Sequence, residues 1–281
     1  MNSPVEQGMW SGLNLRLIAA GLVVINGFFP ALWILLTSLK REVELVQKPI
    51  TWWPQEATLQ NYVQAFTDQP LLIYMKNSFA VAGLSTVVSL LVSAFAAYAI
   101  ARLNLRRRQL ILTCIVGSSM FPLVTLLVPI FETMRALGLL NTYTALVLPY
   151  VVLNLPVCTL VLVGFFQSIP RDLENAAMID GCTRLGALWR VVVPLAAPGV
   201  FTAGILAFVN AWDEFLLALS LNASAVMRTL PVGITLYQGE FSFPWPIISA
   251  ALIVAIVPVA VLIAVFQERV VSGLTQGGLK G

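Results

Sequence analysis

Long stretches without a charged side chain recur along this sequence and alternate with short polar segments. Six stretches are longer than about 20 residues, the length at which a helix crosses about 30 Å of hydrocarbon. The pattern predicts an all-α membrane protein whose six transmembrane helices form one domain over residues 1–281. The expected spans are 15–39, 74–101, 109–132, 144–167, 196–220 and 247–268, with a polar loop over 168–194.

Composition excludes a soluble globular protein. Of the 281 residues, 59% are hydrophobic and 10% are charged, whereas about 25% are charged in ordinary soluble domains. The first apolar stretch is too long for the core of a secretory signal and lacks a small-residue cleavage site followed by a soluble domain. We therefore expect this segment to be retained as a membrane anchor.

Residue usage argues against catalysis. Cys114 and Cys158 lie in apolar stretches and Cys182 lies in the polar loop, which suggests neither a disulfide framework nor a metal site. The sequence has no histidine, the commonest metal ligand and general base. No lysine follows a glycine, as it does in a phosphate-binding loop. We expect no catalytic residue, metal site, cofactor or nucleic-acid partner.

Basic residues predict the orientation in the membrane. If six spans alternate, ten of the 16 basic residues fall on one side, which the positive-inside rule makes cytoplasmic, and both termini lie there too. The longer outer segments, 40–73 and 221–246, are rich in tryptophan and proline. Their aromatic side chains either face a partner or form an interfacial belt. The ten cytoplasmic basic residues are Arg16, Arg102, Arg106, Arg107, Arg108, Arg171, Arg184, Arg190, Arg269 and Lys280.

The polar loop predicts two short helices. Asp172 and Glu174 fall in the first turn of one helix, where acids complement the helix dipole. Gly181 can adopt the left-handed conformation that ends this helix, and Thr183 can cap a second one. Four residues of the first helix share one face by their spacing: Leu173, Ala176, Ala177 and Asp180.

The same loop carries a spaced motif. Ala176-Ala177 is followed by three residues, Gly181, nine residues, Val191, one residue and Val193-Pro194. This arrangement resembles the signature cytoplasmic loop of binding-protein-dependent ABC importer permeases, and Ile179-Asp180-Gly181 is the form typical of carbohydrate permeases. Stretches at 137–150 and 211–215 are also similar to the smaller, six-span permease of the maltose-transporter type. The resemblance covers about residues 75–270.

The resemblance implies a type I ABC importer permease fold and a non-catalytic subunit that imports a sugar or sugar-like solute, such as an oligosaccharide or a glycoside. The chain would form the translocation path with a second, non-identical permease in the lipid of a bacterial-type inner membrane. ATP and Mg²⁺ would be bound by two partner ATP-binding subunits. An extracytoplasmic substrate-binding protein would deliver the solute, and transport would proceed by alternating access.

The resemblance also implies which residues couple to the ATP-binding subunits. One position departs from the family, because Asn175 stands where relatives have a glutamate that pairs with an arginine of that subunit. Asparagine accepts a hydrogen bond but forms no ion pair. Either Glu174 supplies the charge, or docking relies more on packing of the small and apolar side chains. The expected coupling residues are Leu173, Glu174, Asn175, Ala176, Ala177, Ile179, Asp180 and Gly181.

Two further sites are expected nearer the outer side. Asp213 and Glu214 stand in the fifth expected span, where an acid at mid-bilayer costs about 2.5–3.5 kcal/mol. With Trp212 they either line the translocation path or fix the span against the partner permease, or the acids merely reach the interface. The loop 222–246 has the same position in the sequence as a segment that, in the family it resembles, contacts the binding protein. Its expected contact residues are Gly233, Tyr237, Gly239 and Glu240.

Other interpretations remain open at this stage. The same machinery could import glycerol phosphate, a polyol, an amino acid or a peptide. A stand-alone secondary transporter or channel would not need the polar loop and would carry ionisable groups through several spans. A membrane-embedded enzyme would need a convergent nucleophile, base and metal ligands, which the sequence lacks.

Overall fold

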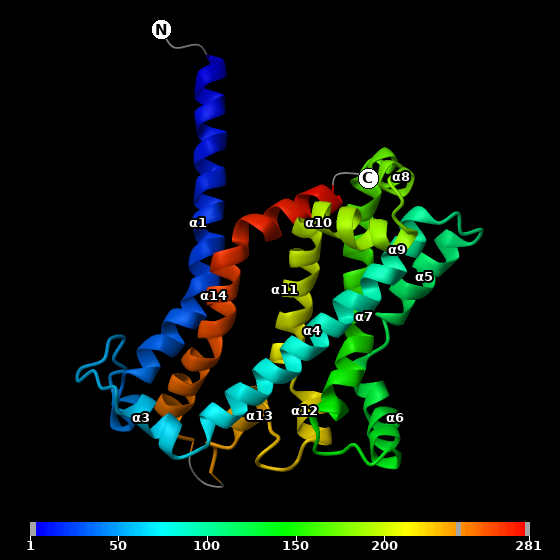
Figure 1. Ribbon diagram of the computed structural model, residues 1–281. Helices are drawn as coiled ribbons and strands as arrows, with labels where there is room; N and C mark the ends of the chain where they lie inside the picture. The colour runs from blue at the N-terminus through cyan, green and yellow to red at the C-terminus, as the bar shows by residue number, and fades with distance from the viewer. Residues whose placement is uncertain (1–3, 240–242, 279–281) are drawn as a thin grey trace. The chain divides into compact units, whose positions relative to one another are not determined.

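The computed structural model describes residues 4–239 and 243–278, and every element in these ranges is helical (Figure 1). This agrees with the all-α class predicted from the sequence. The elements are α1 (Pro4–Ser38), α2 (Glu42–Val46), α3 (Gln60–Thr67), α4 (Leu71–Arg102), α5 (Arg108–Ser118), α6 (Leu123–Ala136), α7 (Tyr143–Ser168), α8 (Arg171–Ile179), α9 (Arg184–Ala187), the π-helical turn η1 (Leu188–Val192), α10 (Val193–Leu195), α11 (Ala197–Asp213), α12 (Leu216–Leu221), α13 (Leu230–Thr235) and α14 (Trp245–Gly278).

Several helices are long and apolar enough to cross a membrane. Among the described residues, four pass by length and composition: parts of α1 and α14, and the whole of α4 and α7. Two bent pairs also pass when each pair counts as one span: α5 with α6 at 88°, and Arg184–Leu195 with α11 at 82°. The protein is therefore a multi-pass membrane protein with four to six candidate spans.

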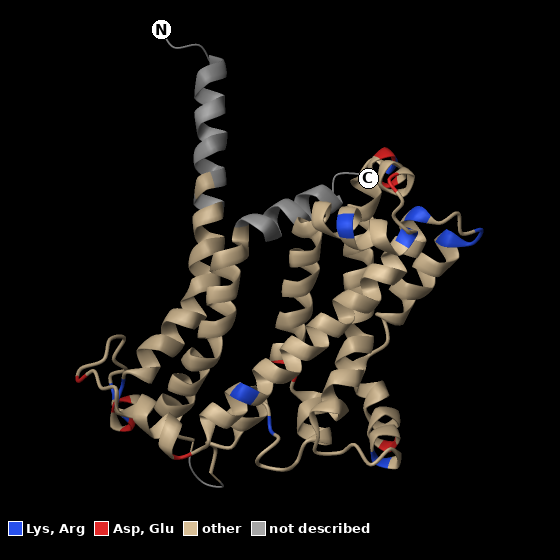
Figure 2. Ribbon diagram, viewed as in Figure 1, with Lys and Arg blue, Asp and Glu red and all other residues tan. Residues whose placement is uncertain are grey.

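The chain divides into two compact units. Unit 1 comprises Met1–Gln69 and Ile234–Val254, and unit 2 comprises Pro70–Gly233 and Ala255–Gly281. Within unit 2, basic segments gather around α8, α9 and the start of α5 (Figure 2). This is the region that the sequence assigned to the basic side of the membrane.

Unit 2 is built around α4, α7 and α11, which pack against one another. Small residues at the contacts let helix backbones approach closely, a common basis of helix association in membranes. At Gly199 of α11, for example, a Cβ would lie 2.3 Å from the ring of Phe165 in α7. The buried small residues of α4 include Ser85, Ser89, Ser93, Ala94 and Ala97.

Polar side chains fix the register of these helices. The Asn154 side chain of α7 donates to the Ala207 carbonyl of α11 at 3.3 Å and accepts from the Asn210 amide at 2.8 Å. The hydroxyls of Thr159 in α7 and Ser93 in α4 lie 3.3 Å apart. Because buried polar groups need partners, sliding one helix along another would leave these groups unsatisfied.

Proline breaks one expected span and not another. The stretch expected to cross as 109–132 is divided between α5 and α6, because Pro122 has extended backbone just before α6 and disfavours helical backbone in the residue before it. In contrast, α7 continues through Pro149 and Pro156. The expected span 196–220 is also interrupted, because α11 ends at Asp213 before the short α12 begins.

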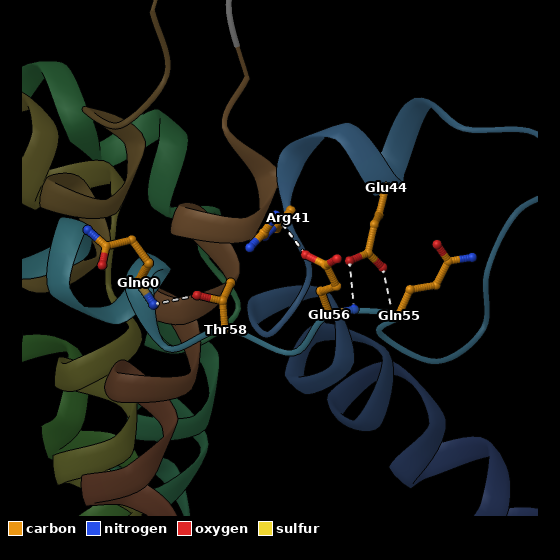
Figure 3. Close-up of polar contacts among 6 residues, drawn as sticks. All are labelled: Arg41, Glu44, Gln55, Glu56, Thr58 and Gln60. Carbon is orange, nitrogen blue, oxygen red and sulfur yellow. Dashed lines mark hydrogen bonds and ion pairs between the residues drawn. The ribbon is translucent and has the colours of Figure 1, made fainter.

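A buried carboxylate organises the polar segment of unit 1 between α1 and α3. Glu44 is 6% exposed and accepts hydrogen bonds from the N–H groups of Gln55 at 3.0 Å and Glu56 at 3.4 Å (Figure 3). The bond from Gln55 above all lowers the pKa of the Glu44 carboxyl. Arg41 forms an exposed ion pair with Glu56 at 2.7 Å. Glu44 thus fixes a loop whose side chains are mostly exposed.

Two further side chains hold the start of this segment. The Asn61 amide donates at 2.8 Å to the carbonyls of Ser38 and Lys40. The Lys40 ammonium is buried, donates to the Thr51 carbonyl and lies 5.1 Å from the centroid of the Trp33 ring, within range of a cation–π interaction. The segment leaves two aromatic side chains exposed: Trp52 and Trp53.

The stability that Glu44 contributes should depend on pH. Its pKa is lowered from 4.5 in the folded chain, so its contribution is present above about pH 4.5 and is lost as the pH falls through the lowered value. Glu44→Gln should therefore lower the thermal unfolding midpoint of the detergent-purified protein at neutral pH, and its difference from the unchanged protein should shrink in acid. Glu56→Gln removes an exposed carboxylate of the same segment and should change the midpoint little. A Glu44→Gln difference that persists undiminished in acid would contradict this role.

Candidate functional site

The polar loop between α7 and α11 folds as the sequence predicts. α8 begins after Pro170, whose backbone is extended, and carries Asp172 and Glu174 in its first turn. Beyond its end, Gly181 has a φ of +92°, the left-handed conformation that glycine supplies at helix ends. A Cβ at Gly181 would meet no atom within 4 Å. The constraint at this glycine is therefore the backbone conformation and not a lack of space.

A second helical segment returns the chain to the core. The Thr183 hydroxyl accepts a hydrogen bond from the Gly186 N–H at 3.1 Å and so caps α9, as predicted. The helix continues through η1 into α10, and Leu188 and Val192 are buried in the apolar cluster formed with α4 and α7. The loop is therefore anchored to unit 2 by packing on its second half.

The first half of the loop is anchored by a buried ion pair. Glu174 is 7% exposed, and its Oε2 lies 3.1 Å from the Nε of Arg102, the last residue of α4. The Tyr98 hydroxyl, one turn earlier in α4, donates to Glu174 Oε1. Arg102 Nη2 also donates to the Ile169 carbonyl between α7 and α8 at 3.0 Å. Burying two charges costs several kcal/mol per ion, which further hydrogen bonds reduce, and Tyr98 and Ile169 each supply one such bond.

The remaining residues expected to couple to the ATP-binding subunits lie at the surface. Leu173 is 46% exposed and Ile179 is 86% exposed, an unusual degree for large apolar side chains. Asn175 is also exposed. Glu174 therefore cannot supply a surface charge in place of Asn175, because its carboxylate is committed to Arg102. The other expected coupling residues, Ala176, Ala177, Asp180 and Gly181, are exposed or partly exposed.

A polar pocket of about 520 Å³ lies beside the ion pair. Its floor is formed by the buried Tyr98, Arg102 and Glu174. Its rim carries the exposed Arg171 and Arg184. The one carboxylate among the lining residues is Glu174, which is paired with Arg102. The complete lining is Tyr98, Arg102, Leu103, Asn104, Arg171, Glu174, Asn175, Met178 and Arg184.

The three residues expected along a translocation path differ in their surroundings. Trp212 is 3% exposed and packs against the rings of Phe79 at 4.7 Å and Phe208 at 5.7 Å. Glu214 lies between α11 and α12 and accepts hydrogen bonds from the N–H groups of Leu217 and Ala218, in the first turn of α12, at 2.8 and 3.1 Å. Its Oε2 also accepts from the Tyr150 hydroxyl at 2.5 Å. Trp212 and Glu214 thus have structural partners within the chain, whereas Asp213 is exposed.

The residues expected to contact a binding protein are mostly enclosed. A Cβ at Gly233 would lie 2.0 Å from the Tyr74 ring, and Tyr237 is 7% exposed with its hydroxyl bonded to the Ala65 carbonyl. Both residues are buried within this chain and shape the segment from within, and their contact with a binding protein stays a prediction. Gly239 is exposed, and Glu240 lies outside the described residues.

Sequence analysis did not single out Arg102 and Tyr98 as partners of the loop. Their spacing of four residues at the end of α4 places both side chains on one helix face. This shared face is visible in the sequence. It did not indicate a partner, because the positive-inside rule already explains an arginine at the end of an apolar span. The pairing of Tyr150 with Glu214 was missed for a similar reason, because residues 64 positions apart give no local pattern.

Comparison with known proteins gives a consistent result. Residues 89–276 match the family described as binding-protein-dependent transport system inner membrane component. The sulfoquinovosyl glycerol transport system permease protein SmoH of Agrobacterium fabrum is 71% identical over 99% of this chain and 98% of its own length. The trehalose/maltose transport system permease protein MalG of Thermococcus litoralis is 38% identical over 95% of this chain and 96% of its own length.

Solved structures support the fold. A chain of a bacterial ABC transporter involved in the import of the acidic polysaccharide alginate superposes with a TM-score of 0.79 at 21% identity, over 95% of this chain and 98% of that one. The alginate transporter in complex with its alginate pentasaccharide-bound periplasmic protein superposes with a TM-score of 0.69. These likenesses confirm the predicted fold class.

Breaking the Arg102–Glu174 pair should destabilise the chain strongly. Either Glu174→Gln or Arg102→Gln leaves one buried charge without its partner, which typically costs about 3–5 kcal/mol. Because the two changes remove the same interaction, the double variant should lose clearly less than the sum. Thermal or denaturant unfolding of the four purified proteins measures this coupling.

The exposed pair Glu132–Arg135, 3.7 Å apart within α6, provides a matched control. The same double cycle there should give about 0–1 kcal/mol, because solvent screens the charges. Equal coupling in the two cycles would show that the buried pair has no special role.

Proposed function

The chain belongs to the family of binding-protein-dependent transport system inner membrane components, and from this premise we propose that it couples the ATP-binding subunits of a sugar importer to the membrane path. Two of its relatives are named as permease proteins of transport systems for sulfoquinovosyl glycerol and for trehalose and maltose. The exposed face of α8, with Leu173, Asn175 and Ile179, is the proposed docking surface for an ATP-binding subunit. Because Asn175 has no charge, α8 itself contributes to docking more through packing of apolar and small side chains than through an ion pair at this position.

One observation carries the proposal: the buried Arg102–Glu174 pair attaches α8 to the end of α4. A subunit that displaced α8 would have to break this pair or move α4 with it. Since α4 packs along α7 and α11, displacement of α8 would be transmitted to helices that cross the membrane. This supports alternating access, in which closure of the ATP-binding subunits rotates the spans and opens the path outward.

The remaining partners follow from the same proposal. A second, non-identical permease would complete the path, and two ATP-binding subunits would hold ATP and Mg²⁺ and perform all hydrolysis. An extracytoplasmic substrate-binding protein would deliver the solute and would contact this chain at the loop that contains Gly239 and Glu240. The basic end of unit 2, around α8 and α9, would face the cytoplasm together with both termini.

The proposed cargo is a sugar or a glycoside. The 71% identical relative is named for sulfoquinovosyl glycerol and another for trehalose and maltose, so a sugar joined to a second group is the favoured class. Asp213, exposed at the end of α11, is the proposed contributor to the path, whereas Trp212 and Glu214 support the local structure around it. Import of glycerol phosphate or a polyol by the same machinery remains the alternative.

Copurification and reconstitution test this function. A tagged copy of the chain should purify with two ATP-binding subunits and a second permease. In proteoliposomes, the complex with its binding protein should accumulate a labelled sugar glycoside only when ATP is present. Accumulation by this chain without any ATP-binding subunit would refute the proposal.

Gly181 provides a second test at the end of α8. A branched residue at a φ of +92° is strained by about 1–2 kcal/mol or more, so Gly181→Val should reduce ATP-driven uptake while the chain still inserts into the membrane. Gly181→Asn is the matched control, because asparagine tolerates left-handed backbone, and it should retain most uptake. If Asn and Val impair uptake equally, the backbone conformation of Gly181 is not what matters.

A further inference from the structure

The pocket beside α8 has an excess of positive charge that no described residue neutralises. Three arginines line it, and the one lining carboxylate, Glu174, is already paired with Arg102. Arg171 donates to the Ala101 carbonyl at 3.4 Å, and neither Arg171 nor Arg184 forms an ion pair within the described part of the chain. The rim therefore presents two exposed guanidinium groups without an acidic partner.

We propose that this pocket receives an acidic side chain of the ATP-binding subunit, so that the charge pairing at the docking surface is made by arginines of the permease. The proposal rests on the proposed function, which assigns the exposed face of α8 to that subunit. It places the attractive charge at Arg171 and Arg184, beside the uncharged Asn175.

Position favours a side chain of the docked subunit as the occupant. Asn175 and Met178 line the pocket and belong to α8, and Asn175 is also exposed. A subunit that covers α8 therefore reaches the rim of the pocket without any rearrangement of the loop. Asp172 of α8 and Asp180, just after its end, are exposed but do not line the pocket, so they do not cancel its charge at the rim.

Chemistry favours a carboxylate. A guanidinium group presents a planar fork of donors that matches a carboxylate with two parallel hydrogen bonds. A volume of about 520 Å³ admits a Glu or Asp side chain together with water. The buried floor is also polar, because Tyr98 and the Arg102–Glu174 pair close it. An apolar side chain would leave the rim charges unmatched.

Cross-linking tests the occupant directly. In the assembled transporter, Arg184→Lys places a primary amine at the rim, and a zero-length carbodiimide joins an amine only to a carboxylate in contact with it. Mass spectrometry should find a new amide bond between position 184 and an Asp or Glu of the ATP-binding subunit. Arg107→Lys introduces the same amine at the start of α5, outside the pocket lining, and should give no such bond. A bond from position 184 only to residues of this chain, or no bond at all, overturns the proposal.

Removing the charge provides an independent measurement. Arg171→Gln with Arg184→Gln should weaken the association of the ATP-binding subunit by roughly tenfold or more and reduce its sensitivity to salt. Arg106→Gln with Arg107→Gln makes the same change of net charge outside the pocket lining and should have a small effect. Equal weakening by both pairs would mean that only net charge matters, and the proposal would fail.

The same experiment separates this idea from its alternatives. If the pocket variants weaken association only in nanodiscs that contain anionic lipid, and not in nanodiscs of neutral lipid, a lipid headgroup occupies the pocket and the proposal is overturned. If the unchanged chain itself binds no ATP-binding subunit, the proposed function fails first. If the unchanged chain binds the subunit normally and the pocket variants bind it equally well, only the inference about the pocket fails.

Discussion

A carboxylate and a guanidinium that are buried together cannot separate at low cost, because each would be left charged in a poorly solvating environment. Glu174 and Arg102 are in this position, at 7% and 9% exposure. One belongs to the short helix α8 and the other to the last turn of α4. The Tyr98 hydroxyl donates a hydrogen bond to Glu174, and Arg102 donates one to the Ile169 carbonyl. The pair therefore acts as a fixed joint between a surface helix and a helix long enough to span the membrane.

Other features of unit 2 connect this ion pair to the long helices on one side and to an exposed surface on the other. Small side chains and a hydroxyl hydrogen bond tie α4 to α7, and an amide hydrogen bond ties α7 to α11, so a force on α8 reaches three packed helices. On the opposite side, α8 leaves Leu173 and Ile179 in solvent. The same short helix thus has one face committed to its own chain and another face free for a partner. The arginine-rich pocket lies beside the joint and adds charge where packing alone would give little specificity.

Sequence reasoning recovered the elements whose cause is local. The uncharged stretches indicated the long helices, and Gly181 and Thr183 marked the end of one short helix and the start of the next, because left-handed glycine and hydroxyl caps act within a few residues. The motif at Ala176, Ala177 and Gly181 identified the family. A helix break near Pro122 is also an effect that a local rule for proline predicts. The same rule does not predict that α7 continues through Pro149 and Pro156, which depends on how α7 packs.

The sequence could not indicate which residues, far apart along the chain, form ion pairs or pack against one another. Glu174 was expected at a docking surface, yet its partner Arg102 lies 72 positions earlier and serves equally well as a marker of membrane orientation. Gly233 and Tyr237 were expected in a contact loop, but ring packing and burial place them inside. These outcomes depend on tertiary contacts, for which neither composition nor periodicity gives a signal.

The central claim is that α8 and α4 move as one body when ATP-binding subunits act on the transporter. Spin labels at Asp172 of α8 and Leu91 of α4, both exposed positions, would report their separation in a background without the three native cysteines. Pulsed electron paramagnetic resonance on the assembled complex, with and without trapped ATP, is the decisive measurement. The account predicts the same distance distribution in both states. A distance that changes with nucleotide would contradict it, because α8 would then move independently of the helix to which it is joined.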